Sequence, residues 1–483
     1  MKNEHTFINI IYLFVIYIFF YLGGIKMNVV EKIKKYSKEV FIKKTVEILE
    51  KDPEKNVDKI FGLIKHTISD PSEIEQVDTV YDLYKNNEAI HNLIQNILTT
   101  TNKNCLDKFF INFFANAVWF GGKKRDEYLK NDDVMAPFTI LISPSMRCTL
   151  KCSGCYAAKY SKKDDIPFEE LDRIIGEARD LGVYYIIILG GEPFINDYML
   201  DIYEKYPDVM FSPFTNGQLI TSEIADRLQK LGNVIPMFSL EGFEKETDAR
   251  RGKGVFQGVM KAMDLFKERG MLFGVSSATS RANVDTVTSD EFIDMLVGKG
   301  AKIGWYFIYM PVGEAPNVDL MLTPKQRIEL GEKVRNIRLT KPYFAADFFN
   351  DAPYVGGCIA GRYYCHINSK EEVEPCVFAH FSTYNVKNKP LVDAFKTDFF
   401  KTLRKSQPYN KNMLMPCMMI DNPKVVRNIV KKVGAYATDP SAEKMVEDSE
   451  FMSKLDKLAS DFKPEAEKAW KEVFNEKGSE SIY

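Results

Sequence analysis

The spacing of apolar residues changes along the chain and separates regions of different predicted structure. Between residues 29 and 133, apolar side chains recur every three or four positions, which is the period of an amphipathic helix. One predicted helix has Asn56 as its N-cap, ends at Asp70-Pro71 and places on one face Val57, Ile60, Phe61, Ile64 and Ile68. A second predicted helix ends at Gly121-Gly122, and its strongly aromatic face consists of Phe109, Phe110, Phe113, Phe114, Ala117 and Val118. We interpret that face as core, with a helix at a membrane surface as the alternative.

From Pro137 onward, short apolar runs alternate with amphipathic stretches. The predicted strands are Phe138–Ser143, Tyr184–Leu189, Val209–Thr215, Val234–Leu240, Leu272–Ala278 and Ile303–Tyr309. The predicted helices between them are Phe168–Leu181, Asn196–Lys205, Thr221–Leu231, Val255–Arg269 and Asp290–Gly298. Strands that alternate with helices form a parallel sheet covered on both faces, and six such units are fewer than the eight of a closed barrel. The predicted fold class is therefore α/β, a partial (β/α)6 barrel of the TIM type with an open side for substrate.

The remaining chain is expected to form separate segments around this barrel. Residues 317–423 contain four cysteines with turn residues between them, which predicts a small α+β extension. Residues 424–483 are charged and helical in pattern, which predicts a solvated helical cap. We therefore expect an apolar N-terminal segment at 1–28, a helical region at 29–133, the barrel at 134–316, the extension at 317–423 and the cap at 424–483.

The N-terminal segment contains an uncharged run from Phe7 to Ile25, and about 20 apolar residues suffice to cross a bilayer. Lysines are frequent between Lys26 and Lys44, whereas Lys2 is the only basic residue before the run. The positive-inside rule then places the rest of the chain in the cytoplasm, anchored to the cytoplasmic face of the membrane. The alternative is that Met27 is the true first residue and the run is not translated.

Composition excludes two broad classes of protein. Hydrophobic residues make up 45% and charged residues 27%, which is ordinary globular usage and argues against a largely disordered chain. Lys and Arg number 65 against 67 Asp and Glu, so no basic excess suggests a nucleic-acid partner. Of the 8 cysteines, Cys105 stands alone in a helical stretch, and the others form two groups. Their close spacing indicates metal ligands in a reducing compartment better than disulfides.

The first group lies directly after the first predicted strand and consists of Cys148, Cys152 and Cys155. Parallel β/α folds place their chemistry at the carboxyl ends of the strands. Three thiolates in one loop can hold three corners of a [4Fe–4S] cluster, and the loop contains no fourth cysteine to close the site. An open metal position is typical of a catalytic centre, and a zinc site completed by a distant ligand is the alternative.

This C-x3-C-x2-C spacing resembles the radical S-adenosylmethionine (radical SAM) superfamily, over roughly residues 136–316. The resemblance implies that the three cysteines hold a [4Fe–4S] cluster and that SAM binds its free iron. It implies further SAM contacts at the strand ends: Gly190, Gly191 and Glu192 at the amino group, Asn216 and Ser239 at the ribose and carboxylate, and Arg251 near the carboxylate. One position departs from the family pattern, since an aromatic residue usually precedes the third cysteine and here that residue is Gly154.

The second group consists of Cys358, Cys365, Cys376 and Cys417. The G-C-x-A-G-R stretch at the first of these, and the Pro-Cys pairs at the last two, resemble SPASM or twitch extensions, which carry auxiliary iron–sulfur clusters. The full set of SPASM cysteines is missing, so the resemblance implies at most one auxiliary [4Fe–4S] cluster. Cys365 is either its fourth ligand or a spare, and a zinc site or uncoordinated thiols are the alternatives.

The resemblance implies an enzyme that cleaves SAM reductively, makes a 5′-deoxyadenosyl radical and takes hydrogen from a substrate, with a ferredoxin or flavodoxin-like protein as electron donor. Whether it is of oxidoreductase or transferase type is left open. A SPASM-like extension favours a peptide or protein substrate. The aromatic helical face and the apolar N-terminus favour a lipid or another apolar metabolite. A third alternative is a non-catalytic, membrane-anchored metal-binding scaffold.

Overall fold

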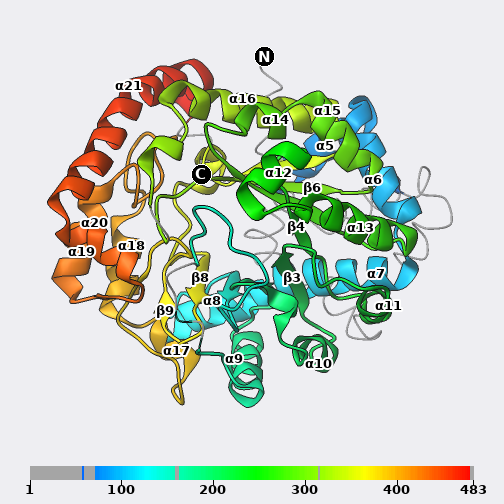
Figure 1. Ribbon diagram of the computed structural model, residues 1–483, viewed down its shortest axis with the longest axis horizontal. Helices are drawn as coiled ribbons and strands as arrows, with labels where there is room; N and C mark the ends of the chain where they lie inside the picture. The colour runs from blue at the N-terminus through cyan, green and yellow to red at the C-terminus, as the bar shows by residue number, and fades with distance from the viewer. Residues whose placement is uncertain (1–56, 59–70, 158–160, 162, 314–315, 479–483) are drawn as a thin grey trace.

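The computed structural model describes residues 57–58, 71–157, 161, 163–313 and 316–478 (Figure 1). The uncharged run at 7–25 and most of the helix predicted over 57–68 lie outside the described residues. Within the described part of the chain, no helix combines the length and apolarity needed to span a membrane.

A nine-stranded sheet, counted over the described residues, forms the centre of the molecule in the order β7-β6-β5-β4-β3-β2-β1-β8-β9. Its first six strands in the chain are β1 (Thr139–Ile142), β2 (Tyr185–Ile188), β3 (Met210–Thr215), β4 (Met237–Ser239), β5 (Gly274–Thr279) and β6 (Ile303–Ile308). Each pairs in parallel with the next, which confirms the six predicted strands and the partial barrel. β4 begins only at Met237 because Pro236 has no N–H for a central ladder.

The helices between these strands lie close to their predicted positions. They are α9 (Phe168–Asp180), η3 (Pro193–Ile195), α10 (Met199–Lys205), α11 (Ser222–Leu231), α12 (Glu244–Arg251), α13 (Val255–Glu268), α14 (Val284–Val287) and α15 (Asp290–Gly298). Successive side chains along each strand point alternately into the interior of the barrel and toward the surrounding helices. Leu141 and Ile187 line an interior cavity, whereas their neighbours Ile140 and Ile186 are fully buried in the core.

Chain beyond Met310 extends the sheet at both ends, which the sequence pattern did not predict. β7 (Phe344–Asp347) pairs in parallel with β6, and β8 (Tyr364–Ile367) pairs in parallel with β1. β9 (Val373–Glu374) is antiparallel to β8, and β10 (Phe381–Ser382) pairs with β11 (Tyr436–Ala437). The short helices here are η4 (Val318–Leu320), η5 (Ala352–Val355), α17 (Leu391–Ala394) and α18 (Asp398–Ser406). β8 and β9 were missed because two- to four-residue strands carry too little alternation to be distinguished from loop.

The N-terminal helices are α5 (Pro71–Asn86), α6 (Glu88–Thr100), α7 (Lys103–Lys108), the π-helix η2 (Phe109–Phe120) and α8 (Gly121–Asp132). The predicted end at Gly121-Gly122 is wrong, because helical backbone continues through both glycines into α8. A Cβ at Gly121 would overlap the carbonyl oxygen of Gly182, so this glycine allows a close approach to the turn before β2. Phe113 of η2 packs edge-on against Tyr185 at the start of β2, so η2 covers the amino-terminal end of the barrel strands.

The C-terminal region consists of α16 (Pro324–Thr340), α19 (Pro423–Val433), α20 (Pro440–Glu447) and α21 (Ser449–Gly478). Figure 1 shows α21 on the side of the molecule opposite α7. The cap is helical as predicted, but it is not simply solvated, because α21 buries Phe462 and Ala466 in a cluster with residues of other helices. Arg327 of α16 joins these elements: it forms a buried ion pair with Asp421 at 2.5 Å and lies 4.0 Å from the centre of the Phe462 ring.

We predict that Arg327→Met lowers the free energy of unfolding by about 3–5 kcal/mol, because it leaves the carboxylate of Asp421 buried without its cation. Lys325→Met is the control on the same helix; it breaks an exposed pair with Glu329 and should change stability by about 0–1 kcal/mol. Urea unfolding followed by circular dichroism measures both. Equal effects of the two substitutions would contradict this role of Arg327.

Candidate active site

The loop after β1 carries Cys148, Cys152 and Cys155, and all three line the interior cavity of about 1490 Å³. Burial raises the pKa of the Cys148 and Cys152 thiols, so a bound cation is needed to favour their thiolate forms. The structure therefore brings the predicted triplet together at the carboxyl end of the first strand.

Hydrogen bonds to the turn after β2 hold this loop in place. The backbone N–H of Gly191 donates to the carbonyl of Ser145 at 3.0 Å, and that of Glu192 donates to the carbonyl of Arg147 at 2.9 Å. A Cβ at Gly190 or Gly191 would overlap the carbonyl oxygen of Ser145 or Arg147, respectively. The two glycines thus let two backbones approach more closely than other residues allow.

Glu192 is 1% exposed and joins the ends of β2 and β3. Its carboxylate accepts hydrogen bonds from the Thr215 hydroxyl at 2.6 Å and from the Asn216 backbone N–H at 2.8 Å. Burial raises the pKa of Glu192, and these donors oppose the rise. The Asn216 side-chain nitrogen lies 3.5 Å from Cys148 Sγ, so the same contact network reaches the first cysteine.

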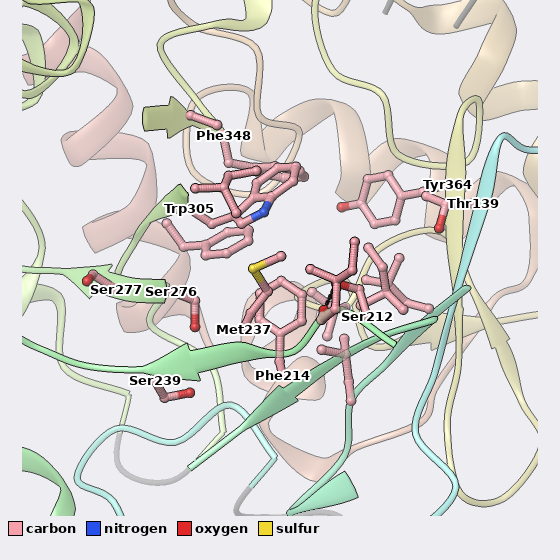
Figure 2. A pocket seen from close by; sticks show the side chains of 18 of the residues that line it. Thr139, Ser212, Phe214, Met237, Ser239, Ser276, Ser277, Trp305, Phe348 and Tyr364 are labelled. Carbon is pink, nitrogen blue, oxygen red and sulfur yellow. Dashed lines mark hydrogen bonds between the residues drawn. The ribbon is translucent and has the colours of Figure 1, made fainter. Parts of the chain in front are cut away.

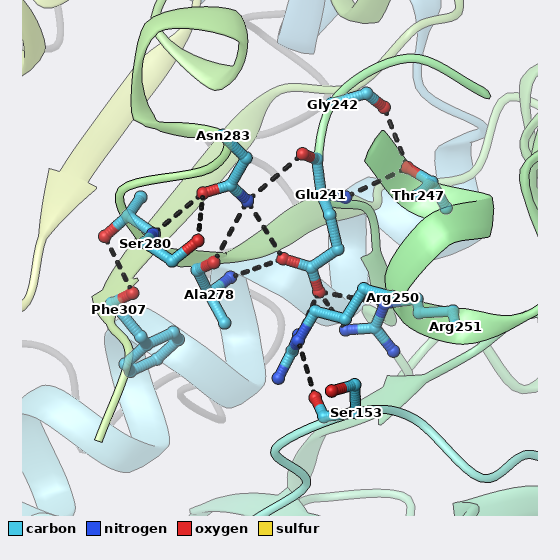
Figure 3. Close-up of polar contacts among 11 residues, drawn as sticks. Ser153, Glu241, Gly242, Thr247, Arg250, Arg251, Ala278, Ser280, Asn283 and Phe307 are labelled. Atoms are coloured by element: carbon cyan, nitrogen blue, oxygen red, sulfur yellow. Dashed lines mark hydrogen bonds and ion pairs between the residues drawn. The ribbon is translucent and has the colours of Figure 1, made fainter. Parts of the chain in front are cut away.

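A second buried carboxylate, Glu241 after β4, holds the arginines of α12 (Figure 3). It is 1% exposed, forms ion pairs with Arg250 and Arg251, and accepts a hydrogen bond from the Ala278 N–H at 3.2 Å. Arg250 in turn bonds the cysteine loop twice: its carbonyl accepts from the Ser153 N–H at 2.9 Å, and its Nε donates to the Ser153 carbonyl at 3.2 Å. Glu241 therefore positions both the predicted SAM contact Arg251 and the loop between the second and third cysteines.

The sequence pattern predicted a role for Ser239 at this strand end and assigned none to Glu241 or Asn283. The Asn283 amide donates to the Glu241 carbonyl at 3.1 Å and to its carboxylate at 3.3 Å. Arg250 and Arg251 follow Glu241 by nine and ten residues, a spacing that carries no recognisable signal. Their contact with Glu241 depends on how α12 packs against the end of β4. The predicted residue Ser239 lines the cavity at the end of β4 (Figure 2).

The structure also explains the missing aromatic residue at Gly154. This glycine has φ +65°, and a Cβ there would lie 2.7 Å from the ring of Tyr309. Tyr309 follows β6 and lines the same cavity. An aromatic ring therefore reaches this part of the cavity from another strand.

Three cysteines of the second group, Cys358, Cys376 and Cys417, line another part of the cavity. The Tyr364 hydroxyl donates to Cys376 Sγ at 2.7 Å, and backbone N–H groups of Phe378 and Met419 lie 3.4 Å from Cys376 Sγ and Cys417 Sγ. Burial raises the pKa of the Cys358 thiol to about 12. Cys365 does not join them: it lies within β8 opposite Ile140, is fully buried and does not line the cavity.

No group of three or more His, Cys, Asp or Glu side chains in the described residues is arranged to hold a single metal ion. A cubane cluster has a different requirement, because each thiolate binds a different iron and the sulfurs stand farther apart. Both cysteine groups supply the soft sulfur ligands that iron–sulfur clusters need.

Comparisons with known proteins identify the family. A model described as the radical SAM superfamily matches residues 142–296. Mycofactocin maturase MftC of Mycobacterium tuberculosis is 30% identical over 279 residues, covering 52% of this chain and 68% of that protein. This chain belongs to the radical SAM superfamily, whose members among these relatives are enzymes.

Other relatives of this radical SAM chain differ in function. The AdoMet-dependent heme synthase of Nitratidesulfovibrio vulgaris is 24% identical over 300 residues, covering 54% of this chain and 80% of that protein. Streptococcus suis SuiB bound to S-adenosylmethionine shares the fold with a TM-score of 0.52 at 20% identity, over 68% of this chain and 87% of that chain. SuiB bound to the precursor peptide SuiA has a TM-score of 0.53 at 19% identity, over 74% and 93%. At such identities these structures establish the fold alone.

The residues present fit the cofactors of the superfamily. Three thiols of one loop face a common cavity, two glycines let that loop lie against the turn after β2, and a paired arginine lies beside the second cysteine.

We predict that Gly191→Ala displaces the cysteine loop, because the added Cβ would overlap the Arg147 carbonyl oxygen. The variant should bind less iron on anaerobic reconstitution and lose about 1–3 kcal/mol of stability. Gly298→Ala, at a helical glycine whose added Cβ meets nothing within 4 Å, is the matched control and should bind iron normally. Full iron content in Gly191→Ala would contradict the close-approach argument.

Proposed function

We propose that this radical SAM enzyme binds a [4Fe–4S] cluster through Cys148, Cys152 and Cys155 and uses it to cleave SAM and abstract hydrogen from a substrate held in the interior cavity. The observation that supports this most strongly is that Cys148, Cys152 and Cys155 all line one cavity of about 1490 Å³. Cys148, Cys152 and Cys155 would hold the cluster, which would supply the electron for reductive cleavage of the SAM carbon–sulfur bond and so the radical that takes a hydrogen atom from the substrate.

The surrounding residues would bind and orient SAM. Gly190, Gly191, Asn216 and Ser239 line the cavity at neighbouring strand ends and would present polar groups to SAM. Glu192, predicted at the SAM amino group, is 1% exposed and does not line the cavity, so it would act by holding Asn216. Arg251 would bind the SAM carboxylate while Glu241 fixes its guanidinium. The walls of the cavity would exclude water from the radical.

The extension would hold one auxiliary [4Fe–4S] cluster on Cys358, Cys376 and Cys417, in a partial SPASM-like arrangement. Supporting this, the three thiols come from separate segments yet line one cavity, and Tyr364 and backbone N–H groups donate to two of the sulfurs. Cys365 lies apart in β8, so the fourth iron would take a ligand that is not a cysteine of this group.

A ferredoxin or flavodoxin-like protein would supply the electron. Iron–sulfur clusters and free thiols are stable in the reducing cytoplasm, so we propose a cytoplasmic location. The uncharged run at 7–25 remains a predicted anchor on the cytoplasmic face of the membrane. A peptide substrate is suggested by the relatives, because a maturase and a structure bound to a precursor peptide are among them. The largely apolar lining of the cavity favours a different substrate class.

We predict that Cys152→Ala abolishes formation of 5′-deoxyadenosine from SAM under dithionite, because one of three cluster thiolates is lost. Cys105→Ala, at a buried thiol outside the cavity lining, is the control and should retain the activity. SAM should also change the electron paramagnetic resonance signal of the reduced wild-type protein. Surviving 5′-deoxyadenosine formation in Cys152→Ala would overturn the proposed site.

The auxiliary cluster is tested by iron content. Cys376→Ala should lower iron by about four atoms per chain, the content of one cluster. Cys365→Ala should leave iron unchanged because Cys365 does not line the cavity. Unchanged iron in both variants would argue against the auxiliary cluster.

A further inference from the structure

The cavity extends well beyond the cysteines. Its volume of about 1490 Å³ would have to hold SAM and the proposed clusters as well as a substrate, whereas small-molecule sites usually measure about 300–1,000 Å³. Its lining includes residues from both ends of the barrel strands and from the N-terminal helices. It therefore runs through the barrel, from the cysteines at the carboxyl ends of the strands to η2 and α6 beneath their amino-terminal ends.

The middle of this channel is lined chiefly by apolar side chains. Figure 2 shows Phe214, Met237, Trp305 and Phe348 directed into one space from different strands and loops. Polar side-chain groups here are hydroxyls and one indole N–H. The Ser212 hydroxyl donates to the Ile235 carbonyl at 2.7 Å, whereas the Thr139 hydroxyl and the Trp305 indole N–H are buried without a hydrogen-bond partner among the described residues. A peptide brings one N–H and one C=O per residue, and burying these without partners is unfavourable. The channel is therefore poorly suited to an extended peptide and well suited to hydrocarbon.

The amino-terminal end of the channel is lined by aromatic and aliphatic residues that η2, α6 and the strand starts contribute, including Phe109, Phe113, Ile94, Leu272 and Ile303. Lys302, directly before β6, lies among them. No ion pair joins Lys302 to a carboxylate of the described residues. At the other end Arg147, Arg250 and Arg251 are paired, and Lys151, which also has no ion pair among the described residues, is exposed, whereas Lys302 is partly buried. Burial and the nearby charge of Lys267 lower the pKa of Lys302, so an anion beside it would be stabilising.

We propose that the channel binds a long hydrocarbon chain whose anionic head group lies at Lys302 and whose far end points toward the SAM site beside Cys148, Cys152 and Cys155. This names the substrate class of the proposed function, on which the reaction itself rests. The hydrogen atom would be taken from an unactivated C–H bond near the end of a lipid chain. Binding itself requires neither the cluster nor SAM, so its test is separate from that of SAM cleavage.

The first test uses straight-chain fatty acids from decanoate to hexadecanoate, with binding to the full-length protein measured by displacement of a fluorescent fatty acid. Affinity should rise about fourfold per added methylene, the gain expected for burying each CH2. Leu129→Ser removes the most exposed large hydrophobic side chain among the described residues and should change nothing, which separates channel from surface binding. An affinity that does not depend on chain length, or that falls in Leu129→Ser, would overturn the proposal.

The second test places the head group. Lys302→Met should weaken binding of hexadecanoate about tenfold, the loss of one charge-assisted contact, and leave hexadecanol unaffected. Lys333→Met is the matched control: this lysine forms an exposed ion pair with Asp285 at 2.9 Å and does not line the channel, so both ligands should bind as before. Equal binding of the acid to wild type and Lys302→Met would overturn the assignment of the anionic end. An unchanged circular dichroism spectrum of the variant would show that it is folded.

Discussion

Close contact between two backbones supports the candidate active site. The loop that carries the cysteine triplet lies against the turn after β2, with two backbone hydrogen bonds and no room for a side chain between them. Since the cysteines come from one loop, whatever fixes that loop fixes the relative positions of three sulfurs. Glycine at 190 and 191 is thus a packing requirement of the candidate metal site.

Two buried carboxylates extend this organisation across the sheet. Glu192 links the ends of β2 and β3 and, through Asn216, reaches Cys148, while Glu241 links β4 and β5 to α12 and, through Arg250, to Ser153. Both are almost fully buried, so each depends on the donors and cations around it. Such networks hold polar groups rigidly at one end of a cavity that is otherwise apolar, which suits a reaction that must aim a reactive group and exclude water.

The chain beyond the barrel contributes to the same cavity. β7 and β8 widen the sheet from both ends, and the loops around them bring three more cysteines to the lining. The N-terminal helices cover the other end of the barrel with the aromatic face of η2. The aromatic face of η2, predicted as core, also forms a wall of the cavity, since Phe113 packs on Tyr185 and lines the channel.

The sequence by itself determined the six β/α units, the cysteine triplet at the end of the first strand and the glycine pair after the second, because periodicity and short spacings are local properties of the chain. Only the tertiary structure decided which cysteines of the second group lie together, that Glu241 pairs with two arginines, that Tyr309 fills the space beside Gly154, and that helices before the barrel and loops after it share one channel. These are contacts between residues far apart in the chain, and their geometry depends on how whole elements pack, which no local pattern records.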